Sequence, residues 1–399
     1  MTAAPGQAGM ARAIAFMVFL GGLAALPPLS IDMALPALGA IGRALHTGPS
    51  QAGLTLSLFM AGFVIGPPVY GPLSDAFGRR RLLLPGMAIF TAGGVAAALA
   101  PSIAVLLIAR FCQGLGAGAG MTLALAIVRD RFDGAAMQRR LAAITVVANL
   151  APIVAPTLGV ALLPLIHWRG IYGVMAACGL AAAVASWAGL SESSRPAVPS
   201  FSTRALLRDT VVVLRHRGAC AAIAVNALGF GWMFAWVAGS PLVLPGLLHM
   251  QPGVYAAWFG ATGLGIVAGA GVNGIIAARG VPGRRLLAIA AGLALTAAAS
   301  LSAAAVAGLV TTAIAMPLFM ASTFSFGLAA PSAARAALDP LQQLSGVAGG
   351  LLTSAQMLAG AASSSLVALL FPTLGLLAVS GVMAICALLA MAAVQRMPH

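Results

Sequence analysis

A short polar stretch between two long apolar segments decides the architecture of this chain. It reads Gly71, Pro72, Leu73, Ser74, Asp75, Ala76, Phe77, Gly78, Arg79, Arg80, Arg81. The glycines permit a tight turn, and the Asp75 carboxylate can accept hydrogen bonds from arginines or from the N-terminus of a facing helix. The arginine run holds the turn at a membrane surface. The stretch therefore predicts a structured turn between two membrane-spanning helices.

Composition extends this prediction to the whole chain. Of its 399 residues, 61% are apolar and 7% are charged, against roughly 25% charged residues in soluble domains. Apolar stretches that can cross a bilayer, about 20 residues long, recur between short polar breaks. We expect twelve spans, at residues 13–38, 52–70, 82–100, 102–128, 141–166, 170–190, 219–244, 254–278, 286–307, 308–330, 346–371 and 374–394. The chain is predicted to be an all-α, polytopic membrane protein.

The net charge of +14 arises from 21 basic residues, all of them arginine, and seven acidic residues. With the N-terminus in the cytoplasm, every arginine falls in a cytoplasmic segment except Arg43 and Arg169, which lie outside, and Arg110, which lies within a span. This pattern follows the positive-inside rule and needs no nucleic-acid partner. We expect a multi-pass protein of the bacterial cytoplasmic (inner) membrane with both termini cytoplasmic. Because lysine is absent, P-loop ATPases and Schiff-base proteins are excluded.

The longest polar break, residues 191–218, separates six predicted spans from six. The sequence after Gly78 recurs about half a chain later, in the run from Gly283 to Leu287. We therefore expect two pseudo-symmetric six-helix bundles, residues 1–190 and 219–399, joined by a cytoplasmic linker. This is the major facilitator architecture, in which the substrate site lies near the middle of the membrane between the bundles.

The run from Gly71 to Arg81 closely resembles the major facilitator signature between spans 2 and 3. The superfamily usually has a basic residue at the position of Ala76, so one gating contact differs here. The resemblance implies a cytoplasmic gate that includes Gly71, Asp75, Gly78, Arg79, Arg80 and Arg81.

Asp32 is the only carboxylate inside a membrane-length apolar segment, and Pro36 follows it four residues later. An ionisable group at that depth is by default a functional site. An ionised carboxylate is costly to bury, which makes the group suitable for carrying a proton. Pro36 has no N–H for the carbonyl of Asp32, so the backbone also needs water or a protein neighbour there. Asp32 is therefore the predicted proton carrier.

Span 4 contains the run from Arg110 to Ala117, which resembles the span-4 signature of drug:proton antiporters. At 1.5 Å per residue, Arg110 lies roughly 12 Å and Asp32 roughly 9 Å from the outer end of its span. The two charges are expected at similar levels, in direct or water-bridged contact. The alternating glycines from Gly114 to Gly120 predict close helix packing.

Span 5 contains Pro152, Pro156 and Gly159, which resemble the proline and glycine signature of antiporters. Bends at the prolines and close approach at the glycine suit a helix that moves during gating. Ala155 and Val160 stand where many relatives have glycine.

Together with Trp168 and Arg169, these runs resemble the bicyclomycin and chloramphenicol resistance (Bcr/CflA) family of efflux proteins, mostly over the N-terminal half. The resemblance implies a proton-coupled exporter of small, largely apolar drugs or toxic compounds that works by alternating access. Under this hypothesis the proton is the coupling ion, no cofactor is needed, and the protein is a monomer in the lipid bilayer rather than an enzyme.

Other side chains at membrane depth are candidates for the substrate cavity: Gln113, Asn149, Asn226, Trp232, Trp236 and Gln356. Hydrogen bonds between helices and contacts with lipid are the alternative uses of such residues. The four cysteines and five histidines are too dispersed for a metal site, and none is expected.

Other functions stay open at this point. The chain could export a native metabolite, such as an amino acid or a sugar derivative, or act as a transporter-derived nutrient sensor. A polytopic membrane enzyme is a further alternative, although the predicted outer loops are short and only seven acids exist in the chain.

Overall fold

The computed structural model describes residues 7–192 and 203–397, and every regular element in these ranges is a helix. The first half comprises α1 (Gln7–Asp32), η1 (Leu35–Ala37), α2 (Leu38–Ala44), α3 (Pro49–Phe77), α4 (Arg79–Ala98), α5 (Ile103–Arg131) and α6 (Gly134–Gly189). The second half follows α7 (Thr203–Arg215) and comprises α8 (Arg217–Pro241), η2 (Leu242–Leu247), α9 (Pro252–Ala278), α10 (Gly283–Val306), α11 (Thr312–Leu338), η3 (Asp339–Leu344), α12 (Ser345–Leu374) and α13 (Leu376–Gln395).

Ten helical segments of the described chain are long and apolar enough to cross a membrane, and two of them have about twice the length of one crossing. The 56-residue α6 bends at His167, whose backbone leaves the helical region (φ 56°, ψ 179°). The 63-residue segment Thr312–Leu374 contains η3, with a non-helical residue at Leu341. Divided at these bends, the described chain makes twelve crossings. The predicted all-α major facilitator architecture is confirmed.

Corresponding helices of the two halves end in the same way. His46 follows α2 and His249 follows η2, and both have a left-handed backbone, with φ of 52° and 50°. Such a residue commonly ends a helix. Three residues later, Pro49 and Pro252 each begin the next helix, where a missing N–H costs nothing. The two helix ends therefore repeat one local structure about half a chain apart.

Each half contains helices that pack backbone to backbone. A Cβ atom at Gly114 of α5 would lie 1.8 Å from the carbonyl oxygen of Phe59 in α3. In the second half, a Cβ atom at Gly327 of α11 would lie 2.1 Å from the carbonyl oxygen of Ile266 in α9. Only glycine permits these approaches, which are typical of packed membrane helices. The packing role predicted for Gly114 is confirmed.

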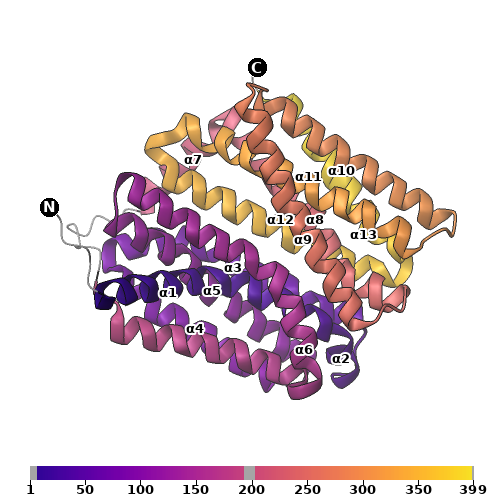
Figure 1. Ribbon diagram of the computed structural model, residues 1–399, viewed down its shortest axis with the longest axis horizontal. Coiled ribbons are helices and arrows are strands. Elements are labelled where there is room, and N and C mark those ends of the chain that lie inside the picture. The colour runs from indigo at the N-terminus through magenta and orange to yellow at the C-terminus, as the bar shows by residue number, and fades with distance from the viewer. Residues whose placement is uncertain (1–6, 193–202, 398–399) are drawn as a thin grey trace.

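Figure 1 shows the first half, indigo to magenta, and the second half, orange to yellow, as two bundles side by side. The halves meet mainly where α3 packs on α12 and where α6 packs on α9. In the first of these contacts, the hydroxyl of Ser354 donates to the carbonyl of Val64 at 3.1 Å. The exact bounds of the two bundles, residues 1–190 and 219–399, stay a prediction.

Candidate functional site

The first span is broken directly after Asp32. Helix α1 ends at Asp32, and the chain continues as the short 3-10 helix η1, which contains Pro36, before α2 begins. The sequence predicted one continuous span here, but the missing N–H of Pro36 leaves the carbonyl of Asp32 without its helical donor and accounts for the break. Asp32 is 5% exposed. Among the described residues, no hydrogen bond or ion pair of its carboxylate is formed.

Gly159 of α6 packs on this break. A Cβ atom at Gly159 would lie 2.3 Å from the carbonyl oxygen of Met33 and 3.2 Å from Cγ of Pro36. The absence of a side chain therefore allows α6 to touch the backbone beside Asp32. Two motifs that lie more than a hundred residues apart in the sequence meet at this point. Pro152 and Pro156 lie earlier in the same helix.

Arg110 of α5 is fully buried inside the first half. Its guanidinium donates to the carbonyl of Ser30 (2.9 Å), the carbonyl of Thr55 (3.4 Å) and Oε1 of Gln113 (2.6 Å). The same group lies over the ring of Phe59, 4.4 Å from its centroid, and 5.4 Å from the ring centroid of Tyr172. Carbonyl, amide and aromatic groups from four elements thus surround the cation.

The direct contact between Arg110 and Asp32 is not formed. The ion pairs among the described residues join Arg79 to Asp75 and Asp130, and Arg208 to Asp209. Arg110 reaches the backbone of Ser30 instead. A water-bridged contact stays a prediction.

One tyrosine of the second half lies near Asp32, and the sequence did not indicate this neighbour. Tyr255 of α9 is buried and close enough to Asp32 for an electrostatic interaction. Its hydroxyl lies 3.1 Å from that of Ser240 in α8, which donates to the carbonyl of Val237. Ser240 lies between Gly239 and Pro241, where α8 ends.

The two tryptophans proposed for the substrate cavity pack inside the second half, and both are fully buried. The Trp232 indole donates to the carbonyl of Ser322 at 3.2 Å. The Trp236 indole donates to Oγ1 of Thr262 at 3.3 Å, and its ring stacks on Phe319 with centroids 3.8 Å apart. In this conformation their polar atoms serve helix packing.

The four polar candidates are distributed over both halves. Gln113 is buried beside Arg110, Asn226 is buried in α8, Gln356 is partly buried in α12 and Asn149 is exposed on α6. The structure does not bring them to one place, and their contact with substrate stays a prediction.

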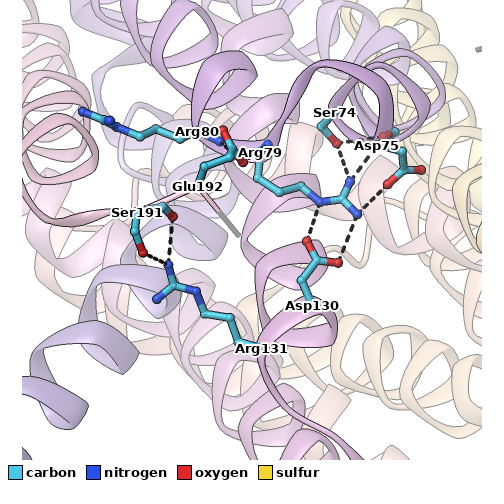
Figure 2. A network of polar contacts seen from close by, with 9 residues as sticks. Ser74, Asp75, Arg79, Arg80, Asp130, Arg131, Ser191 and Glu192 are labelled. Carbon is cyan, nitrogen blue, oxygen red and sulfur yellow. Dashed lines mark hydrogen bonds and ion pairs between the residues drawn. The ribbon is translucent and has the colours of Figure 1, made fainter. Parts of the chain in front are cut away.

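The gating run forms a network around Arg79, shown in Figure 2. The guanidinium pairs with Asp75 of α3 and with Asp130 of α5, the latter at 2.8 Å, and donates to Oγ of Ser74. It also donates to the carbonyl of Gly71 at 3.5 Å. Arg79 is 8% exposed, so these acceptors compensate a largely buried charge. Asp130 lies in a predicted break but was not assigned to the gate.

Glu192, at the start of the linker, caps α4. One carboxylate oxygen accepts from the backbone N–H of Arg79 at 2.6 Å and from that of Arg80 at 3.3 Å. Gly78 has a φ of 103°, and a Cβ atom there would lie 2.5 Å from the Glu192 carboxylate. Gly78 therefore permits both the turn and the cap. We call the end of the molecule that carries Gly78, Arg79 and Glu192 the linker face.

Two arginines beside the gate hold the same chain segment. Arg131 donates to the carbonyl and hydroxyl of Ser191, both at 2.9 Å, as Figure 2 shows. Arg80 donates to the carbonyl of Trp187 at 2.6 Å. Arg81 is exposed. The start of the linker is therefore bound to the turn that separates α3 from α4.

The second half has a network centred on the neutral amide of Asn273 at its linker face. The Asn273 amide of α9 donates to the carbonyl of Leu328 and to Oγ of Ser332, both at 2.7 Å, and accepts from Arg335 at 3.3 Å.

Within the described ranges, no group of three or more His, Cys, Asp or Glu side chains could hold a metal ion.

Twelve crossings in two bundles, with a buried carboxylate at a helix break, define a polytopic membrane transporter. The sequence profile described as Major Facilitator Superfamily matches residues 13–364. This chain belongs to the major facilitator superfamily. The relatives named below are transporters and not enzymes.

Two relatives show what the chain is similar to. It is 35% identical over 266 residues to the uncharacterized MFS-type transporter YdgK of Bacillus subtilis (strain 168), covering 66% of this chain and 65% of the relative. It is 30% identical over 241 residues to the multidrug resistance protein MdtL of Escherichia coli O127:H6 (strain E2348/69 / EPEC), covering 60% of this chain and 61% of the relative. The matches span less than two thirds of either relative.

Solved structures agree in fold. A D-xylose-proton symporter superposes with a TM-score of 0.69 at 16% identity, covering 94% of this chain and 97% of that one. A POT family transporter in complex with 5-aminolevulinic acid superposes with a TM-score of 0.73 at 13% identity, covering 96% and 95%. At these identities the likeness shows the fold alone.

Proposed function

We propose that this protein is a proton-coupled exporter of small, largely apolar drug-like compounds, of the bicyclomycin and chloramphenicol resistance type. It would act as a monomer in the bacterial inner membrane, with both termini cytoplasmic. The observation that carries the proposal is the buried Asp32 carboxylate at the break of α1, without an ion-pair partner among the described residues, against Gly159 of the antiporter-type run. The name of the MdtL relative supports drugs as the substrate class.

Asp32 would take a proton from outside and release it inside. Within residues 7–192 and 203–397, no cation forms an ion pair with its carboxylate. Arg110, in the same half, is bound by neutral acceptors rather than by an acid, so its charge is available to an ionised Asp32 when the helices move. Proton and drug would then alternate in the space between the halves.

Gly159 would couple the movement of the two halves to the movement of the segment that carries Asp32. Because α6 touches the backbone of Met33, a shift of α6 displaces the segment that carries Asp32. Helix α6 also packs on α9 of the second half. A change in the angle between the halves is thus transmitted to the proton site through direct contacts.

The driving force is adequate for export. Moving one charge through 100 mV yields about 2.3 kcal/mol, which sustains a concentration gradient of roughly 50-fold.

The proposal is tested by a proton-release panel. Purified protein in unbuffered detergent solution receives candidate drugs, amino acids and sugar derivatives, and the pH is recorded. Apolar drugs should release protons, and the same drugs should accumulate in everted vesicles under an imposed pH gradient. Accumulation that ignores the pH gradient would contradict proton coupling. Release by metabolites alone would point to metabolite export, and binding without counterflow would point to a sensor.

A further inference from the structure

Helix α7 is held on the second half by one side of its surface. It contacts α8, α12 and η3 at the linker face, as its position in Figure 1 also shows. Val213 is fully buried there, in an apolar cluster with Ala222, Leu286 and Ala333. Helix α7 ends at Arg215, and the membrane-spanning α8 begins two residues later, at Arg217. The helix therefore ends at the level where the bilayer begins.

A second side of α7 is apolar and exposed. Leu207 is 61% exposed, Val211 44% and Leu214 51%. Their spacing of four and three residues places them within about 60° of one another around the helix axis. Val211 and Val213 are separated by about 200°, so this stripe does not face the buried cluster. No contact in the described chain covers it.

Arginines flank the exposed stripe. Arg208 is 74% exposed in its side chain and, among the described residues, pairs with the adjacent Asp209, at 3.1 Å. Arg215 and Arg217 are exposed at the other end of the helix. Around them, the linker face of the second half exposes further arginines: Arg279, Arg285, Arg335 and Arg396. The acidic residues described in this part of the chain are Asp209 and Asp339, so the surface has a clear excess of positive charge.

We propose that α7 is an interfacial helix that binds anionic lipid. The stripe of Leu207, Val211 and Leu214 inserts into the leaflet at the linker face, and Arg208, Arg215 and Arg217 bind phosphate groups of anionic lipids. An apolar stripe flanked by arginines is the pattern of helices that lie in a membrane interface. Basic residues beside a membrane-spanning helix are attracted by anionic headgroups. The proposal does not depend on the transported substrate or on proton coupling.

The binding mode has a structural consequence. The linker begins at Ser191 and Glu192, which are bound to the first half, and ends in α7, which lies on the second. Lipid bound to α7 would therefore hold one end of the linker at a fixed depth while the halves move.

Spin labels on two neighbouring valines test the orientation. The four free cysteines, Cys112, Cys178, Cys220 and Cys386, are replaced by alanine in the full chain. A label is attached after Val211→Cys or, as the matched control, after Val212→Cys. Both valines are 44% exposed, but they point about 100° apart. Collisions with oxygen and with a water-soluble nickel complex are measured in phosphatidylcholine vesicles with and without phosphatidylglycerol.

We expect the label at position 211 to collide severalfold more with oxygen than with nickel when phosphatidylglycerol is present, and the label at 212 to show the reverse. Equal nickel access at both positions would overturn the proposal, because the stripe would face water. Shielding of position 211 from both reagents would overturn it in favour of a protein partner. The same oxygen access with and without phosphatidylglycerol would overturn the role of anionic lipid.

A second measurement uses the unaltered chain. Amide hydrogen exchange in α7 should be severalfold slower in phosphatidylglycerol vesicles than in phosphatidylcholine vesicles. The double variant Arg208→Gln, Arg215→Gln should lose that difference. Equal exchange of the unaltered protein in both vesicles would overturn the proposal even if the cysteine-free variant does not fold.

Discussion

The two halves of this transporter differ in what they bury. Asp32, Arg79 and Arg110, all in the first half, are buried ionisable side chains. Within residues 217–397, the buried polar side chains are neutral, among them Ser240 and Asn273. A buried charge is costly unless hydrogen-bonded partners compensate it. We infer that the ionic steps of coupling and gating belong to the first half, while the second half supplies neutral surfaces.

The linker face shows the same contrast at corresponding positions. In the first half, Asp130 at the end of α5 binds Arg79 through its carboxylate. In the second half, the end of α11 carries Arg335, which donates to the neutral amide of Asn273. Both halves therefore bond neighbouring helices at the linker face. The first half does so with a carboxylate and an arginine, and the second half does so with an arginine and a neutral amide.

The largest expected effect comes from removing the charge at the proton site. Asp32→Asn should abolish drug export driven by a pH gradient, because an amide cannot cycle a proton. Everted vesicles carrying the variant measure this directly, and ligand binding shows that the protein is folded. Ser240→Ala, in the second half, should slow export without abolishing it. Wild-type accumulation by Asp32→Asn would place the coupling chemistry elsewhere.

The gate of the first half should depend on the ion pair between the buried Arg79 guanidinium and Asp130. Asp130→Ala should lower the free energy of unfolding by about 3 kcal/mol, the lower end for removing one partner of a buried charge, because Asp75 still binds Arg79. Denaturant titration in detergent measures the loss. Transport should fall while ligand affinity stays within a few-fold. An unchanged free energy of unfolding would show that the pair contributes little.

The network around the Asn273 amide should contribute less to the free energy of unfolding than the Arg79–Asp130 pair does. Asn273→Ala removes the amide that serves Leu328, Ser332 and Arg335, and should lower the free energy of unfolding by about 2 kcal/mol. The same titration applies. A larger loss of unfolding free energy than in Asp130→Ala would contradict the expectation that the network of the first half is the stronger one.

The smallest effect on the free energy of unfolding is expected at two glycines in repeated positions, Gly78 and Gly283. Gly78→Ala should cost about 1 kcal/mol, because φ is positive there and the new Cβ displaces the Glu192 carboxylate. Gly283→Ala is the matched control, since its Cβ would make only ordinary contacts with Ser332, at 3.7 Å. Equal free energies of unfolding for the two variants would show that the Glu192 cap does not stabilise the gate.

Much of the site could be read from the sequence one segment at a time. The break after Asp32 follows from Pro36, and the turn at Gly78 follows from its glycine and the adjacent arginines. These features depend on backbone rules that involve only near neighbours in the chain. The partners of Arg79 could not be read in this way, because Asp130 lies 51 and Glu192 113 residues away.

The sequence by itself determined the number of spans, the unpaired carbonyl four residues before Pro36 and the glycines that permit close packing. Each depends on local properties: the transfer of apolar side chains into lipid, a missing N–H, or a missing Cβ. Only the tertiary structure decided that Trp232 and Trp236 point into the second bundle, that Arg110 reaches Ser30 rather than Asp32, and that Gly159 touches Met33. These outcomes depend on the rotation of each helix about its axis. In a bilayer both sides of a helix can be apolar, so packing between helices sets that rotation.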